Sequence, residues 1–392
     1  MDDSLIDTED LSLSRKSRLP GAGFFYPDSL DEEYADRRAR EAIEGADVVV
    51  VADGDADGLG CVALLRERYD AALDVAPFEE SLAARTDPDV ADDEDDEDDE
   101  DREESPVGLV TASPHSLDAA LERVAEYADP GVDVYVCDLC PDDESIAEVV
   151  GDIVDRAEST RWFDHHQWDD DVAAAVRDAG ADLVIGDSDE ECTADVTLRS
   201  LDYDFPDHLV DLAAVTRDHD LWIREDPRSD DVADYAHWAS AEEYVTVVGQ
   251  YGPALPDPVV DYLDQRRVEK QQLIEAAVDR AEMESVGPWT VGVTYGRCSQ
   301  NEVAETLREQ GADAAVIVKP AGSASIRGSD DFEHAHEVAG LVNGGGHPQA
   351  AGCKPDIYDD MLDYAHHWTT EGYATKQVIL AAFEQVAHEV DE

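Results

Sequence analysis

The sequence predicts an α/β protein in which a helix joins a parallel-sheet domain to a second, smaller α/β domain. The 392 residues, 43% of them hydrophobic, are too many for one ordinary core and enough for two. In the first half, short β-branched segments alternate with helix-like segments, the order that produces a parallel sheet covered on both faces. The same alternation resumes after a long polar stretch with helix-like character at residues 256–284, which predicts the second domain.

The first domain is predicted to span residues 46–250, after a polar lead-in at 1–45. It opens with a β-branched strand at 46–51, an acidic loop at 53–58 and a helix at 59–69. The following elements repeat this order: strands at 107–111, 132–138, 161–163 and 182–185, with helices at 116–127 and 144–157. Because ligands bind outside the carboxyl ends of such strands, we expect function in the loops that follow them.

The remaining segments are an insertion, a linker and the second domain. Residues 87–104 are almost purely acidic and can bury nothing, so they predict a disordered insertion. A linker helix is predicted at 251–286 and the second domain at 287–392. Within that domain we expect a strand at 290–295, a helix at 301–310, strands at 314–319 and 323–327, and a helix at 334–341.

The charge of the chain is strongly negative: 97 acidic against 28 basic residues give a formal net charge of −69. Acidic residues spread along a sequence that otherwise has the pattern of a folded protein are typical of proteins in molar salt. There the Debye length is roughly 3 Å, so the repulsion between the acidic side chains is screened. The first residues, MDDSLIDTED, lack the basic and apolar regions of a secretory leader, and no apolar run approaches the roughly 20 residues of a membrane span. We therefore expect a halophilic, cytoplasmic protein with no membrane partner.

Three carboxylates follow the first predicted strand. Asp53, Asp55 and Asp57 occupy alternate positions of a tight turn, and Gly58 allows the chain to turn. Carboxylates held this close repel one another unless a cation neutralises them. An acidic surface turn is the alternative for this motif alone, given the composition.

Further acidic and imidazole side chains follow the later apolar elements. Asp138 ends one predicted strand, and Asp164, His165 and His166 follow another. An apolar helical stretch ends at Asp218 or Asp220, which compete for the same role. Imidazole beside carboxylates suits Mn²⁺ better than Mg²⁺ or Ca²⁺. Four clusters placed alike in one domain predict a shared centre with two divalent ions.

This order of motifs, DGDADG, VCD, DHH and a later Asp, resembles the DHH phosphoesterase superfamily. The downstream segments SASIRGS and GGGHPQAAG resemble the C-terminal substrate-binding domain of RecJ-type exonucleases and nano-RNases. The resemblance covers about residues 46–355. It implies metal ligation by Asp53, Asp55, Asp138, His165 and Asp218, assisted by Asp57, with His166 on the scissile phosphate and Asp164 supporting it. It also implies that Arg327, Gly344, Gly345, Gly346 and His347 hold the substrate phosphate.

The resemblance implies a metal-dependent phosphodiester hydrolase in which two ions, Mn²⁺ in preference to Mg²⁺, activate a water. A RecJ-like single-strand exonuclease and a short-oligonucleotide phosphodiesterase fit equally, and a nucleotide phosphatase is a lesser alternative. The alternative from another class is a non-catalytic scaffold or nucleic-acid-binding subunit of a replication or repair assembly.

The acidity of the chain conflicts with a polyanionic substrate. Counterion release contributes little to nucleic-acid binding at high salt, so binding has to rest on metal ions, a few basic residues and stacking. Trp168 and Trp222 each lie just past a predicted metal motif. They are therefore the candidate stacking residues, although most tryptophans belong to cores.

Overall fold

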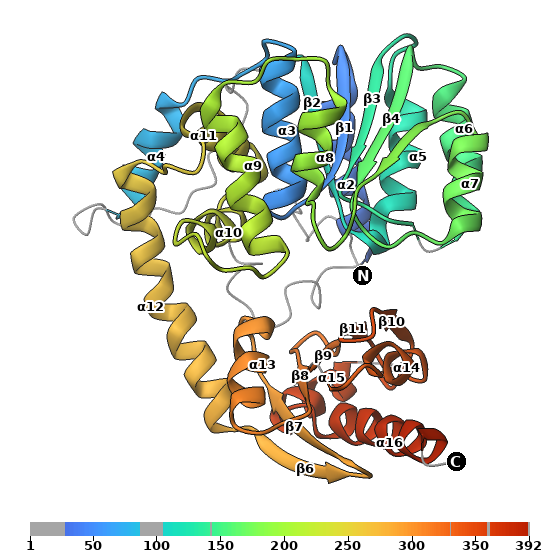
Figure 1. Cartoon of the computed structure of the whole chain (residues 1–392), viewed down its shortest axis with the longest axis vertical. Helices are drawn as coiled ribbons and strands as arrows, with labels where there is room; N and C mark the ends of the chain where they lie inside the picture. Colours follow the sequence, from blue (N-terminus) through green and yellow to red (C-terminus); the bar gives the residue numbers. More distant parts are fainter. Residues whose placement is uncertain (1–27, 87–104, 142, 330, 359–360, 391–392) are drawn as a thin grey trace, which may run out of the picture. The chain divides into compact units, whose positions relative to one another are not determined.

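The structure is a computed structural model that describes residues 28–86, 105–141, 143–329, 331–358 and 361–390. The predicted acidic insertion at 87–104 and most of the predicted lead-in lie outside the described residues. Contacts divide the chain into two compact units, one spanning Asp28–Asp264 and the other beginning at Gln265 (Figure 1). Within the described residues, no helix has the length and apolarity to cross a membrane.

The first unit is built on a five-stranded, entirely parallel sheet with the strand order β2-β1-β3-β4-β5. The strands are β1 (Val48–Asp53), β2 (Val107–Ala112), β3 (Asp133–Cys137), β4 (Ser159–Asp164) and β5 (Asp182–Ile185). Four consecutive valines of β1 are buried because this central strand is covered on both faces. The predicted parallel-sheet α/β class is confirmed.

Helices cover both faces of this sheet (Figure 1). Val48 and Val50 pack with one group of helices and Val49 and Val51 with the other, since successive side chains of a strand point to opposite faces. On the first face lie α3 (Ala56–Arg68), α4 (Ala76–Thr86), α8 (Thr193–Ser200), α9 (Asp207–Asp220), α10 (Ser229–Trp238) and α11 (Ala241–Tyr251). On the other lie α2 (Asp28–Ile43), α5 (Leu117–Tyr127), which follows a short 3₁₀ turn at Pro114–Ser116, α6 (Ile146–Val154) and α7 (Asp170–Asp178).

The second unit holds a six-stranded mixed sheet with the strand order β10-β11-β9-β8-β7-β6. The strands are β6 (Glu282–Val286), β7 (Trp289–Tyr295), β8 (Ala314–Val318), β9 (Ala324–Gly328), β10 (Gly344–Gly346) and β11 (Ala350–Cys353). The helices α14 (Ala335–Gly340) and α16 (Tyr373–Val390) cover one face, and α13 (Gln300–Glu309) and the later part of α12 (Asp257–Asp279) cover the other. α15 (Met361–Thr369) precedes α16.

Two segment predictions differ from the structure. The predicted start at residue 46 leaves α2 outside the first domain, whereas Ala39 and Ile43 of α2 are buried against its sheet. The predicted linker helix at 251–286 is wrong at its end, because α12 stops at Asp279 and β6 follows. β6 pairs with β7 as an antiparallel hairpin through Gly287, whose φ of +56° suits a tight turn. The charged, mostly exposed residues of β6 resemble a helix surface in sequence, which explains the misprediction.

Candidate metal centre

The carboxyl ends of three neighbouring parallel strands carry the candidate site. Asp53 ends β1, Asp138 follows β3 and Asp164 ends β4. Because β1, β3 and β4 are adjacent in the sheet, these side chains converge at one edge. The hypothesis that residues far apart in sequence meet at one rim of a sheet therefore agrees with the geometry of this structure.

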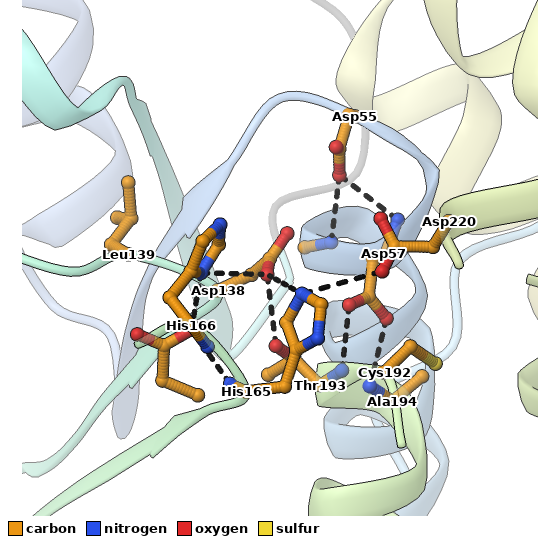
Figure 2. Close-up of polar contacts among 12 residues, drawn as sticks. Asp55, Asp57, Asp138, Leu139, His165, His166, Cys192, Thr193, Ala194 and Asp220 are labelled. Atoms are coloured by element: carbon orange, nitrogen blue, oxygen red, sulfur yellow. Dashed lines mark hydrogen bonds and ion pairs between the residues drawn. The ribbon is translucent and has the colours of Figure 1, made fainter. Parts of the chain in front are cut away.

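Three overlapping groups of side chains have the geometry of metal sites, and Figure 2 labels all their members except Asp53. Within each group, one potential ligand atom per residue lies within 4.8 Å of the others. The groups are Asp138, His165 and His166; Asp57, His165 and Asp220; and Asp53, Asp55 and Asp138. Asp138 and His165 each belong to two groups, so the three groups form one continuous cluster.

The turn between β1 and α3 positions the first three carboxylates. Asp55 is the N-cap of α3, and its carboxylate accepts hydrogen bonds from the backbone N–H groups of Asp57 (3.0 Å) and Gly58 (3.1 Å). A Cβ at position 58 would collide with the backbone oxygen of Asp53, so the tight turn requires glycine there. The cap and the glycine together bring the alternate carboxylates of the DGDADG motif to the rim of the sheet.

The beginning of α8 holds two of the buried carboxylates (Figure 2). Asp57 accepts hydrogen bonds from the backbone N–H groups of Thr193 (2.6 Å) and Ala194 (2.8 Å). The Thr193 hydroxyl donates to Asp138 at 2.8 Å, and its side chain is fully buried. Helix N-termini favour negative charge, so α8 supports both carboxylates. Sequence reasoning missed Thr193, because no local pattern links it to partners 136 and 55 residues away.

Asp164 organises the DHH segment. Its carboxylate is fully buried and accepts hydrogen bonds from the backbone N–H of His165 (2.8 Å) and the indole N–H of Trp168 (2.6 Å). Nδ1 of His166 lies 2.7 Å from the same carboxylate. This contact assigns the proton to Nδ1 and directs Nε2 of His166 away from Asp164. Trp168 therefore orients Asp164 in this structure.

The electrostatics of the cluster favour a bound cation. Burial, and then the charge of Asp55, raises the pKa of Asp53 to about 6. Burial and the charge of Asp57 raise the pKa of Asp220 to about 8. The pKa of Asp138 is raised well above its ordinary value, again by burial first and then by the neighbouring carboxylates. So many carboxylates held together are unstable as anions unless positive charge is added.

His166 responds to the same negative field, and His165 lies within it. Burial lowers the pKa of His166, but the hydrogen bond to Asp164 and the surrounding carboxylates outweigh it and raise that pKa to about 9. Nε2 of His165 lies 3.3 Å from Asp220 Oδ2 and 3.8 Å from Asp138 Oδ1. Neither His165 Nδ1 nor Asp220 Oδ2, both buried, has a hydrogen-bond partner in the described chain. A set of imidazole and carboxylate groups that includes buried atoms without a hydrogen-bond partner fits a divalent transition ion such as Mn²⁺.

The placement of Asp218 corrects the sequence prediction, which preferred it to Asp220. Asp218 accepts hydrogen bonds from the backbone N–H groups of Glu225 (2.9 Å) and Asp226 (3.1 Å) and lies outside the three groups. Although burial raises the pKa of Asp218, hydrogen bonds from Ser229 and those two N–H groups lower it overall. Residues two apart on a helix point in nearly opposite directions, so only one of the pair can face the cluster, and that one is Asp220.

The predicted substrate-binding residues gather in the second unit. Gly344, Gly345 and Gly346 form β10, which pairs with β11, and Arg327 of β9 pairs with β11 on its other side. His347 begins the turn between β10 and β11, where its backbone N–H donates to the carbonyl oxygen of Ala350 (2.8 Å). The predicted glycine-rich loop is therefore the first strand of a hairpin whose second strand, β11, pairs with the strand of Arg327.

Arg327 has the electrostatics of an anion site. Its Nε donates to Asn301 (2.9 Å) and its Nη1 to the carbonyl oxygen of Ala351 (3.2 Å), so the guanidinium is held in place. Burial, and then the charge of Arg308, lowers the pKa of Arg327. Burial and the charge of Arg327 lower the pKa of Lys319 in turn. These cations destabilise one another, and a bound phosphate would relieve that repulsion.

The three glycines are expected to differ in their tolerance of alanine. A Cβ at Gly346 would collide with the Ala350 backbone, and its φ of +138° is strained for other residues, whereas a Cβ at Gly345 meets nothing within 4 Å. We expect Gly346→Ala to lower the free energy of unfolding by about 1–3 kcal/mol and Gly345→Ala to change it by about 0.5 kcal/mol or less. Urea unfolding followed by circular dichroism measures both, and equal losses would contradict this account of the hairpin.

Comparison with known proteins supports the fold. No model of a protein family matches the chain, and no curated protein matches it by sequence. RecJ from Thermus thermophilus, solved with Mn²⁺, matches with a TM-score of 0.51 and 16% identity over 90% of this chain and 55% of that one. Another structure, of exonuclease RecJ bound to manganese, matches with a TM-score of 0.48 and 16% identity over 88% of this chain and 94% of that one.

A third similar structure is an exopolyphosphatase-related protein from Bacteroides fragilis. It matches with a TM-score of 0.39 and 12% identity over 92% of this chain and 98% of that one. At such low identities the likeness concerns the fold, and the T. thermophilus structure carries it. This chain spans about half the length of that RecJ. The fold predicted from the motif order is thus confirmed: the chain has a RecJ-like fold.

Proposed function

We propose that the chain is a metal-dependent phosphodiester hydrolase that acts on single-stranded or short nucleic acids. The observation that carries the proposal is the cluster of three overlapping ligand groups at the carboxyl ends of β1, β3 and β4. Buried carboxylates with raised pKa values are costly to maintain in a fold, and perturbed groups of this kind concentrate at functional sites. The cluster is therefore better explained by ion binding than by the general acidity of the chain.

The residues divide naturally between two ions. Asp53, Asp55 and Asp138 would hold one, and Asp57, His165 and Asp220 the other. Asp138 can serve both, since its Oδ1 lies 3.8 Å from Nε2 of His165. When bound, two divalent ions supply Lewis acidity to a water and balance charge on the phosphate. Mn²⁺ fits this donor set better than Mg²⁺, because imidazole stands beside the carboxylates.

The chain's own residues supply the remaining chemistry. Asp164 fixes the ring of His166 through Nδ1. We assign His166 the contact with the scissile phosphate, where an imidazole held in place would, when protonated, stabilise charge that develops on the oxygens. In the second unit, Arg327 with Gly344, Gly345, Gly346 and His347 would hold a substrate phosphate. Gly345→Ala is the suitable variant for testing this assignment, because a methyl group at position 345 meets no other atom and should leave the fold intact.

The support from α8 predicts a measurable dependence of metal affinity on Thr193. Thr193→Val keeps the side-chain shape and removes the hydrogen bond to Asp138. We expect about 10–100-fold weaker Mn²⁺ binding, the usual loss when a partner of a metal ligand is removed. Calorimetric titration measures it, and Thr193→Ser should restore binding to within a few fold. Unchanged affinity in Thr193→Val would refute this role of α8.

The direct test is product-length analysis at high salt. End-labelled single-stranded DNA, long RNA, dinucleotides and mononucleotides are incubated with Mn²⁺, with Mg²⁺ or with a chelator. We expect ion-dependent cleavage of diester bonds, and the product lengths separate an exonuclease from a short-oligonucleotide hydrolase. Release of inorganic phosphate from mononucleotides alone would indicate a nucleotide phosphatase. Oligonucleotide binding without any cleavage would replace the proposal with a non-catalytic scaffold.

A further inference from the structure

The loop after α9 has an unusual backbone conformation beside the metal cluster. α9 ends at Asp220, a member of the cluster, and the chain turns directly afterwards. Trp222 has a φ of +54° and Arg224 a φ of +57°, which places both in the left-handed region. Residues other than glycine rarely adopt this conformation, and the surrounding structure must hold them in it. Two such residues in one short loop indicate that the contacts around it fix its shape.

Asp218 holds this loop in place. Its carbonyl oxygen accepts hydrogen bonds from the N–H groups of Ile223 (2.9 Å) and Arg224 (3.1 Å). Its carboxylate accepts two more, from the N–H groups of Glu225 and Asp226. Four consecutive N–H groups therefore converge on one buried residue. This network fixes the direction of the side chains at 222–224 relative to Asp220, which lies on the same helix end.

The fixed loop presents apolar and cationic groups together. Trp222 is half-buried, with the His219 ring edge-on at 5.7 Å. The guanidinium of Arg224 lies over the Trp222 ring at 4.7 Å, and an ion pair with Asp230 (3.2 Å) anchors it. Ile223 between them is 47% exposed. The loop therefore carries an exposed aliphatic side chain and, next to it in sequence, an arginine stacked on an indole.

The chemistry of this loop matches a nucleobase. Bases stack on aromatic rings and on arginine planes, and this contact persists when salt screens ionic attraction. A chain with a formal charge of −69 gains little from long-range attraction to a polyanion, so contacts to bases must contribute more. We propose that Trp222, Ile223 and Arg224 form a stacking subsite for the base next to the scissile phosphate, with Asp218 as its positioning residue. This inference rests on the proposed hydrolase function.

The test compares two substrates that differ only in their bases. A short thymidine oligomer and an oligomer of the same length with tetrahydrofuran in place of every base are hydrolysed with Mn²⁺ at high salt. The readout is the ratio of kcat/KM for the thymidine oligomer to that for the abasic oligomer. We expect this ratio to fall about tenfold in Trp222→Ala, mainly through KM for the thymidine oligomer, and to recover in Trp222→Phe. Asp218→Asn, which disturbs two of the four hydrogen bonds, should lower the ratio in the same direction.

Tyr203→Ala is the matched control. Tyr203 is 38% exposed and donates to Glu67, near the end of α3 opposite to Asp57, so its removal should leave the ratio unchanged. Equal losses on both oligomers, or no loss on either, in Trp222→Ala would overturn the stacking subsite. If the wild-type protein hydrolyses neither oligomer, the proposed function fails separately, and the same ratio is taken from dissociation constants measured by fluorescence anisotropy. An unchanged affinity ratio in Trp222→Ala would again overturn the subsite.

Discussion

Replacing Asp138 by Asn is expected to lower kcat for phosphodiester hydrolysis by at least about a thousandfold. Asp138 belongs to the group proposed for one ion and lies 3.8 Å from His165 of the group proposed for the other, so its loss should affect both. Lewis acidity and charge balance by two ions contribute several kcal/mol to such reactions, and each 1.4 kcal/mol corresponds to about tenfold in rate. Single-turnover hydrolysis of a labelled oligonucleotide with saturating Mn²⁺ measures the effect.

The design of this variant isolates charge from structure. Asp138 has a φ of +62°, a conformation that Asn tolerates as well as Asp does, so the backbone should be retained. Removing one of several buried, mutually repelling carboxylates should also leave the metal-free protein at least as stable as the wild type. Asp211→Asn is the control, because Asp211 is half exposed on α9 and pairs with Arg228. Activity of Asp138→Asn within tenfold of that control would contradict the assigned role.

Removing the ions is expected to destabilise the protein more as pH rises. Burial first, then Asp55, raises the pKa of Asp53 to about 6, and burial first, then Asp57, raises that of Asp220 to about 8, against about 4 in an unfolded chain. The folded state therefore holds these protons more tightly than the unfolded state. This contribution to stability is complete below pH about 4 and is lost as the pH rises through about 6 to 8.

Bound ions should reverse that loss. At a hundred times its Kd, an ion that binds only the folded state adds about 2.7 kcal/mol per site, which raises Tm by about 5–10 °C in a unit of this size. Thermal unfolding with chelator or Mn²⁺, at pH 5 and pH 8 and constant high salt, measures both the loss of stability with rising pH and the gain from bound ions. Without metal, Tm of Asp220→Asn should fall less with rising pH than Tm of the wild type. This difference distinguishes the contribution of the cluster from that of the acidic surface. An identical fall in wild type and variant would place its origin elsewhere.

Local pattern was sufficient for the architecture of the first unit. The β-branched run of β1 and the strand at Asp182–Ile185 were predictable because buried parallel strands are short, apolar and bounded by turn residues. The two segments that differ, α2 and β6, have mostly polar sequences, and only their tertiary partners determine their packing. A polar segment carries little periodic signal, so its place in a fold is decided by contacts that the local sequence does not contain.

The site residues at the ends of strands were predictable from the sequence, whereas those that helices contribute were not. Asp53, Asp138 and His165 follow buried strands of one parallel sheet, which fixes the edge where they meet. The choice between Asp218 and Asp220 depends on how α9 is rotated about its axis. Ala213 of α9 contacts Cys192, the N-cap of α8, and Asp220 lies two turns further along the same face. That rotation is set by the packing of α9 against α8, a tertiary contact.

The stoichiometry of Mn²⁺ binding tests the account most directly. Electron paramagnetic resonance of the purified chain at high salt counts free and bound Mn²⁺, with Asp211→Asn as control and Asp138→Asn and Asp220→Asn as test variants. We predict two ions per chain in the wild type and control, and fewer in both test variants. No bound ion in the wild type, or two ions retained in both test variants, would show that the cluster at the carboxyl ends of β1, β3 and β4 is not a metal centre.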